Sequence, residues 1–254
     1  MLYQIQQYLK FLLRSTNQHG VHSPFVYQLV TQCFYDKTRY DAYKSIKNYK
    51  AALLRNKERI SVTDLGAGSR VHKHPERTIA SIAKYAGTST KRSKLLYRLV
   101  TYLNCSSILE LGTSLGIATR ALSLANPKAS ITSIEGCQNI ATFTKRQLQN
   151  DNIEIIGSDF GEYLQTIKKE SFDLIFFDGN HQKEATLNYF ESLLPTAHND
   201  SVFIFDDIHW SKGMTEAWDL IKQHPRVAVT IDTFKWGFVF FRKEQAKEHF
   251  SIRV

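Results

Sequence analysis

Residues 107–122 read SILELGTSLGIATRAL, a short apolar run that leads into a turn bounded by Gly112 and Gly116 and then into an amphipathic stretch. The run predicts a buried strand, and the stretch after it predicts a helix. Glycines at such a junction let the backbone approach a ligand closely, and the N–H groups at the start of the helix can bind an anion. The segment therefore predicts a strand-turn-helix unit that holds the anionic part of a cofactor.

The chain beyond residue 107 repeats this alternation of apolar runs and amphipathic stretches, which is typical of βαβ units. We expect strands at 107–111, 130–135, 152–156, 172–178, 201–206, 227–232 and 236–242, and helices at 117–125, 137–149, 160–168, 182–194 and 213–223. The last two strands are separated by residues 233–235, too few for a crossover helix, so they should pair antiparallel. The pattern predicts an α/β fold with a Rossmann-like, seven-stranded, mostly parallel sheet that ends in an antiparallel hairpin.

Residues 1–104 lack this rhythm and read as mainly helical, so we expect an N-terminal extension or lid at 1–104 and an α/β domain at 105–254. Residues 1–14 form an amphipathic pattern, not a signal peptide, which predicts a helix that packs on the domain or lies on a surface. No apolar run has the length of a membrane span, so we expect no stable membrane insertion and a cytoplasmic protein.

The charge balance points to anionic partners. The chain has 33 lysines and arginines against 24 acids, a formal net charge of +9. Such a charge favours encounter with nucleic acid, anionic lipid or a phosphorylated small molecule, and it does not choose among them. Basic residues are frequent in the first hundred positions. This part of the chain either lines a site for an anion or presents a basic surface to solvent.

The second predicted strand ends in Glu135, which follows Gly116 by 135 − 116 = 19 residues. Nucleoside-binding folds place at this position the acid that accepts the ribose hydroxyls. Asp159, after the third strand, is positioned to meet the adenine edge. The other candidate cofactor contacts at the same strand ends are Glu110, Gly112, Thr113, Ser114, Thr119, Gly136 and Ser158.

The glycine patterns allow three other interpretations. Residues 112–116 match the G-x-S-x-G nucleophile elbow of hydrolases, but no strands precede them as that fold requires. A nicotinamide site would need G-x-G-x-x-G, which is absent. Residues 64–70 read DLGAGSR and lack the helix and the strand-ending acid of a cofactor loop. With Lys73 and His74 they either cradle an acidic part of a substrate or form a plain turn.

Two further buried runs end in aspartates, Asp178 after 172–177 and Asp206-Asp207 after 201–205. Neighbouring parallel strands lie about 4.8 Å apart, so these carboxylates should converge at the carboxyl edge of the sheet. Clustered carboxylates repel one another, and an all-oxygen group suits a hard ion such as Mg²⁺. The alternative without a metal is that one aspartate caps a helix while another contacts a cofactor amine.

Four motifs occur in the order and spacing of a known family: ELGTSLG at 110–116, Glu135, FDGNH at 177–181 and FDDIHW at 205–210. They resemble those of class I S-adenosylmethionine-dependent methyltransferases, in particular metal-dependent O-methyltransferases of the catechol and caffeoyl-coenzyme A type and sugar O-methyltransferases with a D-x-x-H pattern. The resemblance covers residues 106–242, and the N-terminal part resembles uncharacterised bacterial methyltransferases.

The resemblance implies S-adenosylmethionine as cofactor, with Asp178 also near it, and Mg²⁺ or another divalent ion held by Asp178, Asp206 and Asp207. His181 stands where catechol-type members carry the proton-accepting lysine, so His181 and Asp178 are the implied catalytic residues, with His209 in reserve. Asp207 replaces the usual asparagine. Ala118 replaces a frequent serine that binds the methionine carboxylate, so Ser114 or Thr119 would substitute for it.

The expected activity is divalent-metal-assisted O-methylation of a hydroxyl on a small molecule, with an anionic acceptor favoured by the charge. Two other classes stay open: an RNA (tRNA) methyltransferase that uses the basic extension, and a cofactor-binding module without catalysis. As partners we expect the small-molecule acceptor and a second copy of the chain in a homodimer. The sequence does not identify the acceptor.

Overall fold

The computed structural model describes residues 2–63, 74–149, 152–167 and 171–254. The chain divides into two compact units, a first unit of Met1–Tyr35 with Ile167–Val254 and a second unit of Asp36–Thr166. The predicted extension, residues 1–104, thus contributes to both units. Compact units and functional domains are different divisions of a chain, so the boundary at residue 104 stays a prediction.

The second unit contains the parallel strands β3 (Ser107–Leu111), β4 (Ser130–Glu135) and β5 (Ile153–Gly157), with β4 in the middle. Helices α6 (Ile117–Ala125) and α7 (Gln138–Gln147) make the two crossovers, and α8 (Phe160–Leu164) follows β5. Four of the five residues of β3 are buried, as a strand covered on both faces requires. The order of these elements and the bounds of β3, β4 and α6 agree with the sequence prediction. Strand β5 is shifted by one residue, and α7 and α8 end two and four residues earlier than predicted.

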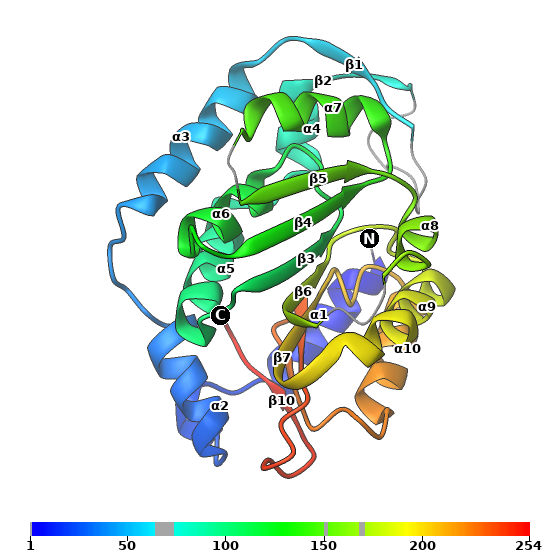
Figure 1. Ribbon diagram of the computed structural model, residues 1–254. Coiled ribbons are helices and arrows are strands. Elements are labelled where there is room, and N and C mark those ends of the chain that lie inside the picture. Colours follow the sequence, from blue (N-terminus) through cyan, green and yellow to red (C-terminus); the bar gives the residue numbers. More distant parts are fainter. Residues whose placement is uncertain (1, 64–73, 150–151, 168–170) are drawn as a thin grey trace. The chain divides into compact units, whose positions relative to one another are not determined.

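The remaining part of the second unit is mainly helical, with α3 (Ala42–Arg55), α4 (Ile79–Tyr85) and α5 (Thr90–Leu103). Thr78 and Ser89 cap α4 and α5 through their hydroxyl oxygens. Helix α3 packs on α4, α5 and α6 (Figure 1). A short antiparallel pair, β1 (Arg59–Ser61) and β2 (Glu76–Thr78), was not predicted, because its residues are mostly polar and exposed.

The first unit carries five strands in the order β10-β8-β9-β7-β6. They are β6 (Phe172–Phe177), β7 (Ala197–Asp206), β8 (Val229–Asp232), β9 (Trp236–Phe240) and β10 (Glu248–Ser251). Strands β6 and β7 run parallel, and β9 is antiparallel to both β7 and β8, which confirms the predicted C-terminal hairpin. Strand β10 adds a parallel edge strand beside β8 that was not predicted. Helices α9 (Lys183–Leu193) and α10 (Lys212–Gln223) lie side by side (Figure 1), with the 3-10 turn η3 (Leu194–Thr196) after α9.

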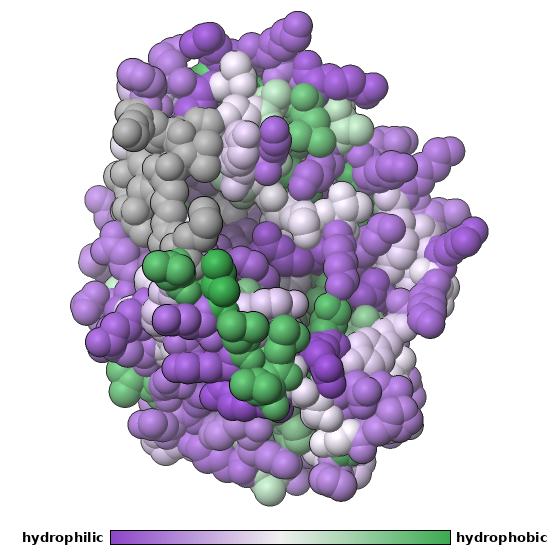
Figure 2. Space-filling view, turned by 180° about the vertical axis from the view of Figure 1, so that it is seen from behind, coloured by the Kyte–Doolittle hydropathy of each residue, from purple (hydrophilic) through white to green (hydrophobic). Residues whose placement is uncertain are grey.

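The N-terminal segment of the first unit contains α1 (Leu2–Arg14), η1 (Gln18–Gly20), α2 (Pro24–Leu29) and the π-helical turn η2 (Val30–Phe34). A bridge between Thr16 and Ile252 joins this segment to the end of the chain. Hydrophobic side chains gather in a stripe over α1 on the face shown in Figure 2. Among the described residues, no helix has both the length and the apolar character needed to cross a bilayer.

Candidate functional site

The glycine turn after β3 has the backbone that the sequence predicted. Gly112 and Gly116 have positive φ values of 111° and 71°, and a Cβ added at Gly116 would come within 2.5 Å of Leu148 Cδ1. Other residue types are therefore strained at Gly116. No side chain caps the N-terminus of α6. The turn and the uncapped helix together form a place where backbone N–H groups can bind an anion.

Glu135, at the end of β4, is joined directly to this turn. Its Oε2 accepts a hydrogen bond from Ser114 N at 2.7 Å, and its Oε1 accepts one from Cys137 N at 2.9 Å. The side chain is largely buried. The two backbone bonds fix the orientation of the carboxylate at the end of β4, next to the glycine turn.

Glu110 lies beneath the turn and is fully buried. Its Oε2 accepts hydrogen bonds from Thr119 Oγ1 at 2.6 Å and Ser133 Oγ at 2.5 Å, while Oε1 has no hydrogen-bond partner among the described residues. Burial raises the pKa of this carboxyl to about 7; its two hydroxyl donors oppose the rise, and the charge of Glu135 adds to it. Glu110 is therefore a titratable group inside the candidate cofactor site.

The other predicted residues of the turn also bond within the protein. The hydroxyl of Thr113 lies 2.6 Å from that of Ser133, and Thr119 donates its hydroxyl proton to Glu110. Ser114 and Thr119 are the two residues predicted to bind the methionine carboxylate in place of a serine at position 118. The hydroxyl of Thr119 donates to Glu110, and the backbone N–H of Ser114 donates to Glu135. The predicted contact with a methionine carboxylate stays a prediction for both residues.

The residues after β4 and β5 lie close to the same turn. Gly136 directly follows Glu135, and Ser158 N donates to the carbonyl of Glu135 at 3.1 Å. Asp159 is the N-cap of α8, because its Oδ1 accepts from Gly161 N at 2.8 Å and from Glu162 N at 3.3 Å. This capping bond holds the carboxylate at the carboxyl edge of β5, and its predicted contact with an adenine edge is not tested.

In the first unit, Asp178, His181 and Asp206 form one cluster. Their candidate ligand atoms all lie within 4.8 Å of one another, Asp206 is buried and the other two are partly buried. Asn180 and His181 both have positive φ values, 62° and 25°, in the turn that follows β6. Two carboxylates and one imidazole are a donor set that suits a divalent ion.

The cluster differs from the predicted ligand set, which included Asp207 in place of His181. Asp207 has φ 51° at the end of β7, and its carboxylate pairs with Lys235 Nζ at 3.3 Å. Among the described residues, the group of three ligand atoms contains Asp178 and Asp206 without Asp207. The turn of the backbone and the ion pair explain why this carboxylate is directed elsewhere.

His209, the reserve catalytic residue, is buried inside the first unit. Its Nε2 lies 2.9 Å from Asp232 Oδ2, and its Nδ1 lies 3.2 Å from Thr215 Oγ1. Its ring stacks on Phe234, with centroids 5.5 Å apart. Both ring nitrogens of His209 are thus engaged within the first unit, and its reserve catalytic role stays a prediction.

Two residues that sequence reasoning missed hold the glycine turn from outside. Tyr49, on α3, donates its hydroxyl to Leu115 O at 2.8 Å, and Thr144, on α7, donates to Ser114 O at 2.8 Å. Burial raises the pKa of the Tyr49 hydroxyl. Neither residue stands in a motif, and their spacing in the chain gives no sign of these contacts.

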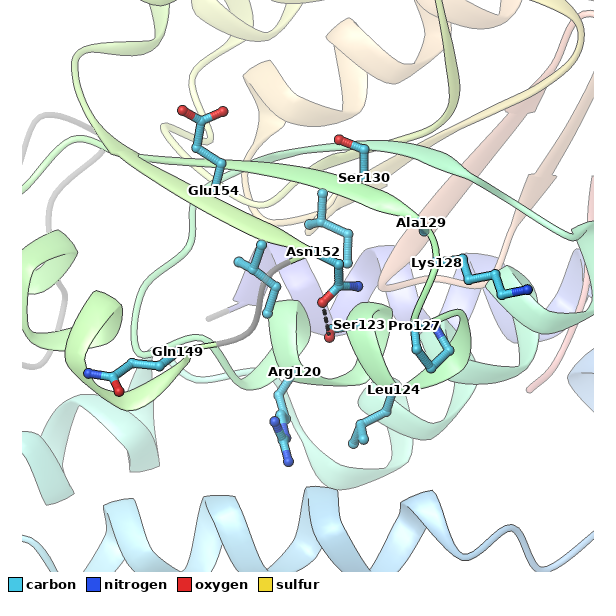
Figure 3. Close-up of a pocket in the computed structure, with 12 residues that line it drawn as sticks. Arg120, Ser123, Leu124, Pro127, Lys128, Ala129, Ser130, Gln149, Asn152 and Glu154 are labelled. Carbon is cyan, nitrogen blue, oxygen red and sulfur yellow. Dashed lines mark hydrogen bonds between the residues drawn. The ribbon is translucent and has the colours of Figure 1, made fainter.

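A cavity of about 840 Å³ in the second unit lies away from these residues (Figure 3). It is lined by residues such as Ser130 and Ile153, which begin β4 and β5, while the glycine turn follows the carboxyl end of β3. Arg120 and Asn152 also line it, and Asn152 accepts a hydrogen bond from Ser123 at 3.0 Å. The predicted loop of Asp64–Arg70, with Lys73, lies outside the described residues.

The sequence and the fold were compared with known proteins. A family model described as a methyltransferase domain matches residues 109–208. No curated protein matches the sequence. The fold resembles that of an O-methyltransferase from Bacillus cereus solved with SAH, at 20% identity and a TM-score of 0.55, covering 83% of this chain and 95% of that chain.

Two other solved structures have a similar fold. The methyltransferase PaMTH1 of Podospora anserina, SAH-bound, is 14% identical with a TM-score of 0.61, covering 88% of this chain and 98% of that chain. The O-methyltransferase TomG of Streptomyces achromogenes, in complex with SAM, is 15% identical with a TM-score of 0.57, covering 81% and 91%. At these identities the likeness establishes the fold, which is the predicted Rossmann-like methyltransferase fold. The segment that the family model matches, residues 109–208, lies within that fold.

Proposed function

We propose that the chain is an S-adenosylmethionine-dependent methyltransferase that transfers the methyl group to a hydroxyl of a small molecule. The observation that carries the proposal is the hydrogen bond from Ser114 N to Glu135 Oε2, which joins the glycine turn to the strand-ending acid. The solved O-methyltransferases of similar fold were obtained with SAH or SAM. In the proposal, the glycine turn and Glu135 bind the cofactor, and the cluster of Asp178, His181 and Asp206 activates the acceptor.

The cofactor part of the proposal assigns a task to each feature of the turn. The uncapped start of α6 receives the methionine carboxylate, Glu135 accepts from the ribose hydroxyls, and Asp159 faces the adenine. Titration calorimetry with S-adenosylhomocysteine should show binding to the wild type, and Glu135→Gln should weaken it. An unchanged affinity in Glu135→Gln would remove the basis of the proposal.

The metal part rests on the cluster of Asp178, His181 and Asp206, whose donor atoms fit a divalent ion. A bound divalent ion at these residues would orient the acceptor oxygen and lower the pKa of its hydroxyl. An imidazole beside two carboxylates suits Mn²⁺ or another first-row ion as well as Mg²⁺. Activity after dialysis against a chelator, followed by addition of each ion, tests this part separately from cofactor binding.

We assign His181 the removal of the hydroxyl proton, because an imidazole nitrogen that is not bound to the ion can accept a proton as the methyl group moves. The assigned reaction is an in-line displacement in which the acceptor oxygen attacks the sulfonium methyl group. A screen of hydroxylated small molecules with labelled S-adenosylmethionine would identify the acceptor. The basic charge of the chain makes anionic acceptors the first to be screened.

RNA methylation is a second candidate, favoured by the basic side chains on α5, which include Lys91, Lys94 and Arg98. Lys94 lies over the ring of Tyr43, and Arg98 donates to the Tyr43 hydroxyl at 3.2 Å. Methylation of bulk tRNA that falls steeply with added salt would support this candidate. Activity on small molecules that depends little on salt would exclude it.

A further inference from the structure

Helix α1 turns its apolar side chains toward solvent. Five of them are exposed: Leu2 by 78%, Ile5 by 52%, Leu9 by 56%, Leu12 by 38% and Leu13 by 88%. At about 100° per residue, these five positions fall within an arc of about 100° of the helix circumference. We call this set the α1 stripe, and it corresponds to the hydrophobic stripe in Figure 2.

The opposite side of α1 is the one that packs on the first unit. Phe11 is buried, and its ring lies 5.7 Å from that of Phe234, which Tyr8 also contacts at 4.8 Å. Directly after the helix, Thr16 N donates to Ser251 O at 2.9 Å, and Arg253 N donates to Thr16 O at 3.1 Å. The helix is therefore anchored with its apolar stripe outward.

The charges of α1 match an anionic surface. The helix contains Lys10 and Arg14, both exposed, and no aspartate or glutamate. By the same helical angles, Lys10 lies about 60° from the nearer edge of the α1 stripe and Arg14 about 100°, so Lys10 is the cation closer to a surface that the stripe contacts. An anchored helix with an exposed apolar face and a cation near its edge is suited to lie in the plane of a bilayer, with the apolar face below the headgroups. Each lysine or arginine near anionic lipid adds about fivefold to the affinity.

A second copy of the chain fits the stripe less well. The exposed part of the five side chains amounts to on the order of 500 Å², below the roughly 800 Å² that each partner buries in a stable complex. Two chains of formal charge +9 also repel each other. We propose that the α1 stripe docks this protein on membrane surfaces that contain anionic lipid, with the helix lying on the bilayer and not crossing it.

Vesicle flotation tests the proposal with the full chain. We expect the wild type to float with vesicles of phosphatidylcholine and phosphatidylglycerol in a seven-to-three ratio, and not with phosphatidylcholine alone. The double variant Leu9→Gln/Leu13→Gln should weaken binding at least about tenfold, because it removes two apolar side chains from the bilayer contact. Lys10→Gln should weaken it about fivefold.

Leu54 and Leu220 offer a matched control, because they are exposed by 43% and 46% on α3 and α10. Leu54→Gln/Leu220→Gln should bind vesicles as the wild type does. The proposal fails if the wild type binds neither vesicle or both equally, or if the control pair weakens binding as much as the stripe variant. Sedimentation that shows a dimer dispersed by Leu9→Gln/Leu13→Gln would also overturn it, since a second copy would then cover the stripe.

Discussion

At the scale of single residues, Glu110 makes folding stability depend on pH. Burial raises the pKa of its carboxyl from 4.5 to about 7 in the folded chain. Between these values the folded state keeps a proton that the unfolded state releases, so the free energy of unfolding falls as the pH rises through this window. The loss in unfolding free energy reaches on the order of 3 kcal/mol above pH 7 and is absent below pH 4.5.

Glu110→Gln removes this titration while keeping an oxygen that can accept from Thr119 and Ser133. We expect the variant to lack the fall in stability between pH 5 and pH 8 that Glu110 contributes to the wild type. Urea unfolding at both pH values measures the difference. Equal pH dependence in the two proteins would show that the carboxyl is not the group responsible.

His181 can act as base or as metal ligand, and the two roles predict different losses. As the base, His181→Gln should lower kcat by about a hundredfold or more and leave the affinity for Mn²⁺ unchanged. If His181 is a metal ligand, the main effect of His181→Gln should be a higher Kd for Mn²⁺. Titration of the variant with Mn²⁺, followed by electron paramagnetic resonance, distinguishes the base role from the ligand role. Asp178→Ala is the reference variant for loss of activity, because it should abolish turnover and keep the affinity for the cofactor.

At the scale of elements, the glycine turn depends on helices far away in the chain. Tyr49→Phe removes the hydroxyl that α3 donates to Leu115 O and keeps the ring. We expect the Kd for S-adenosylhomocysteine to rise about fivefold, because one hydrogen bond that fixes the turn is lost. Tyr43→Phe, on the same helix with its hydroxyl bonded to Arg98, is the control and should bind as the wild type does.

Gly116 sets how closely the turn packs on α7. In Gly116→Ala the new methyl would meet Leu148 and Thr144 at a positive φ, so we expect a loss of about 2 kcal/mol or more in unfolding free energy, together with weaker cofactor binding. Gly213→Ala should lower the unfolding free energy far less, because a Cβ added there would lie 3.3 Å from its nearest neighbour, Lys183 Cβ. Thermal unfolding of both variants compares them, and equal melting temperatures would contradict the packing argument.

At the scale of the whole molecule, the sequence predicted the elements that consist of buried apolar runs. The bounds of β3, β4 and α6 agree with the prediction, and buried isoleucine or leucine side chains recur in all three. Strand β10 was missed, because it is an edge strand in which Phe250 is the sole buried residue. The first residues of β7 are polar, so the predicted strand began four residues late.

The candidate site was predictable where a motif coincides with a strand end. This holds for the glycine turn, for Glu135 and for the meeting of Asp178 with Asp206, since parallel strands bring their carboxyl ends together. The ion pair of Asp207 with Lys235 was not predictable, because it depends on a left-handed backbone and on a loop between two later strands. The same is true of Tyr49, whose partner lies 66 residues away.

The pairing of Thr16 with residues 251–253 means that the two ends of the chain support each other. Proteolytic trimming at Glu248 would therefore loosen α1 as well as remove an edge strand. Amide hydrogen exchange in residues 5–14 should rise sharply in a chain cut there.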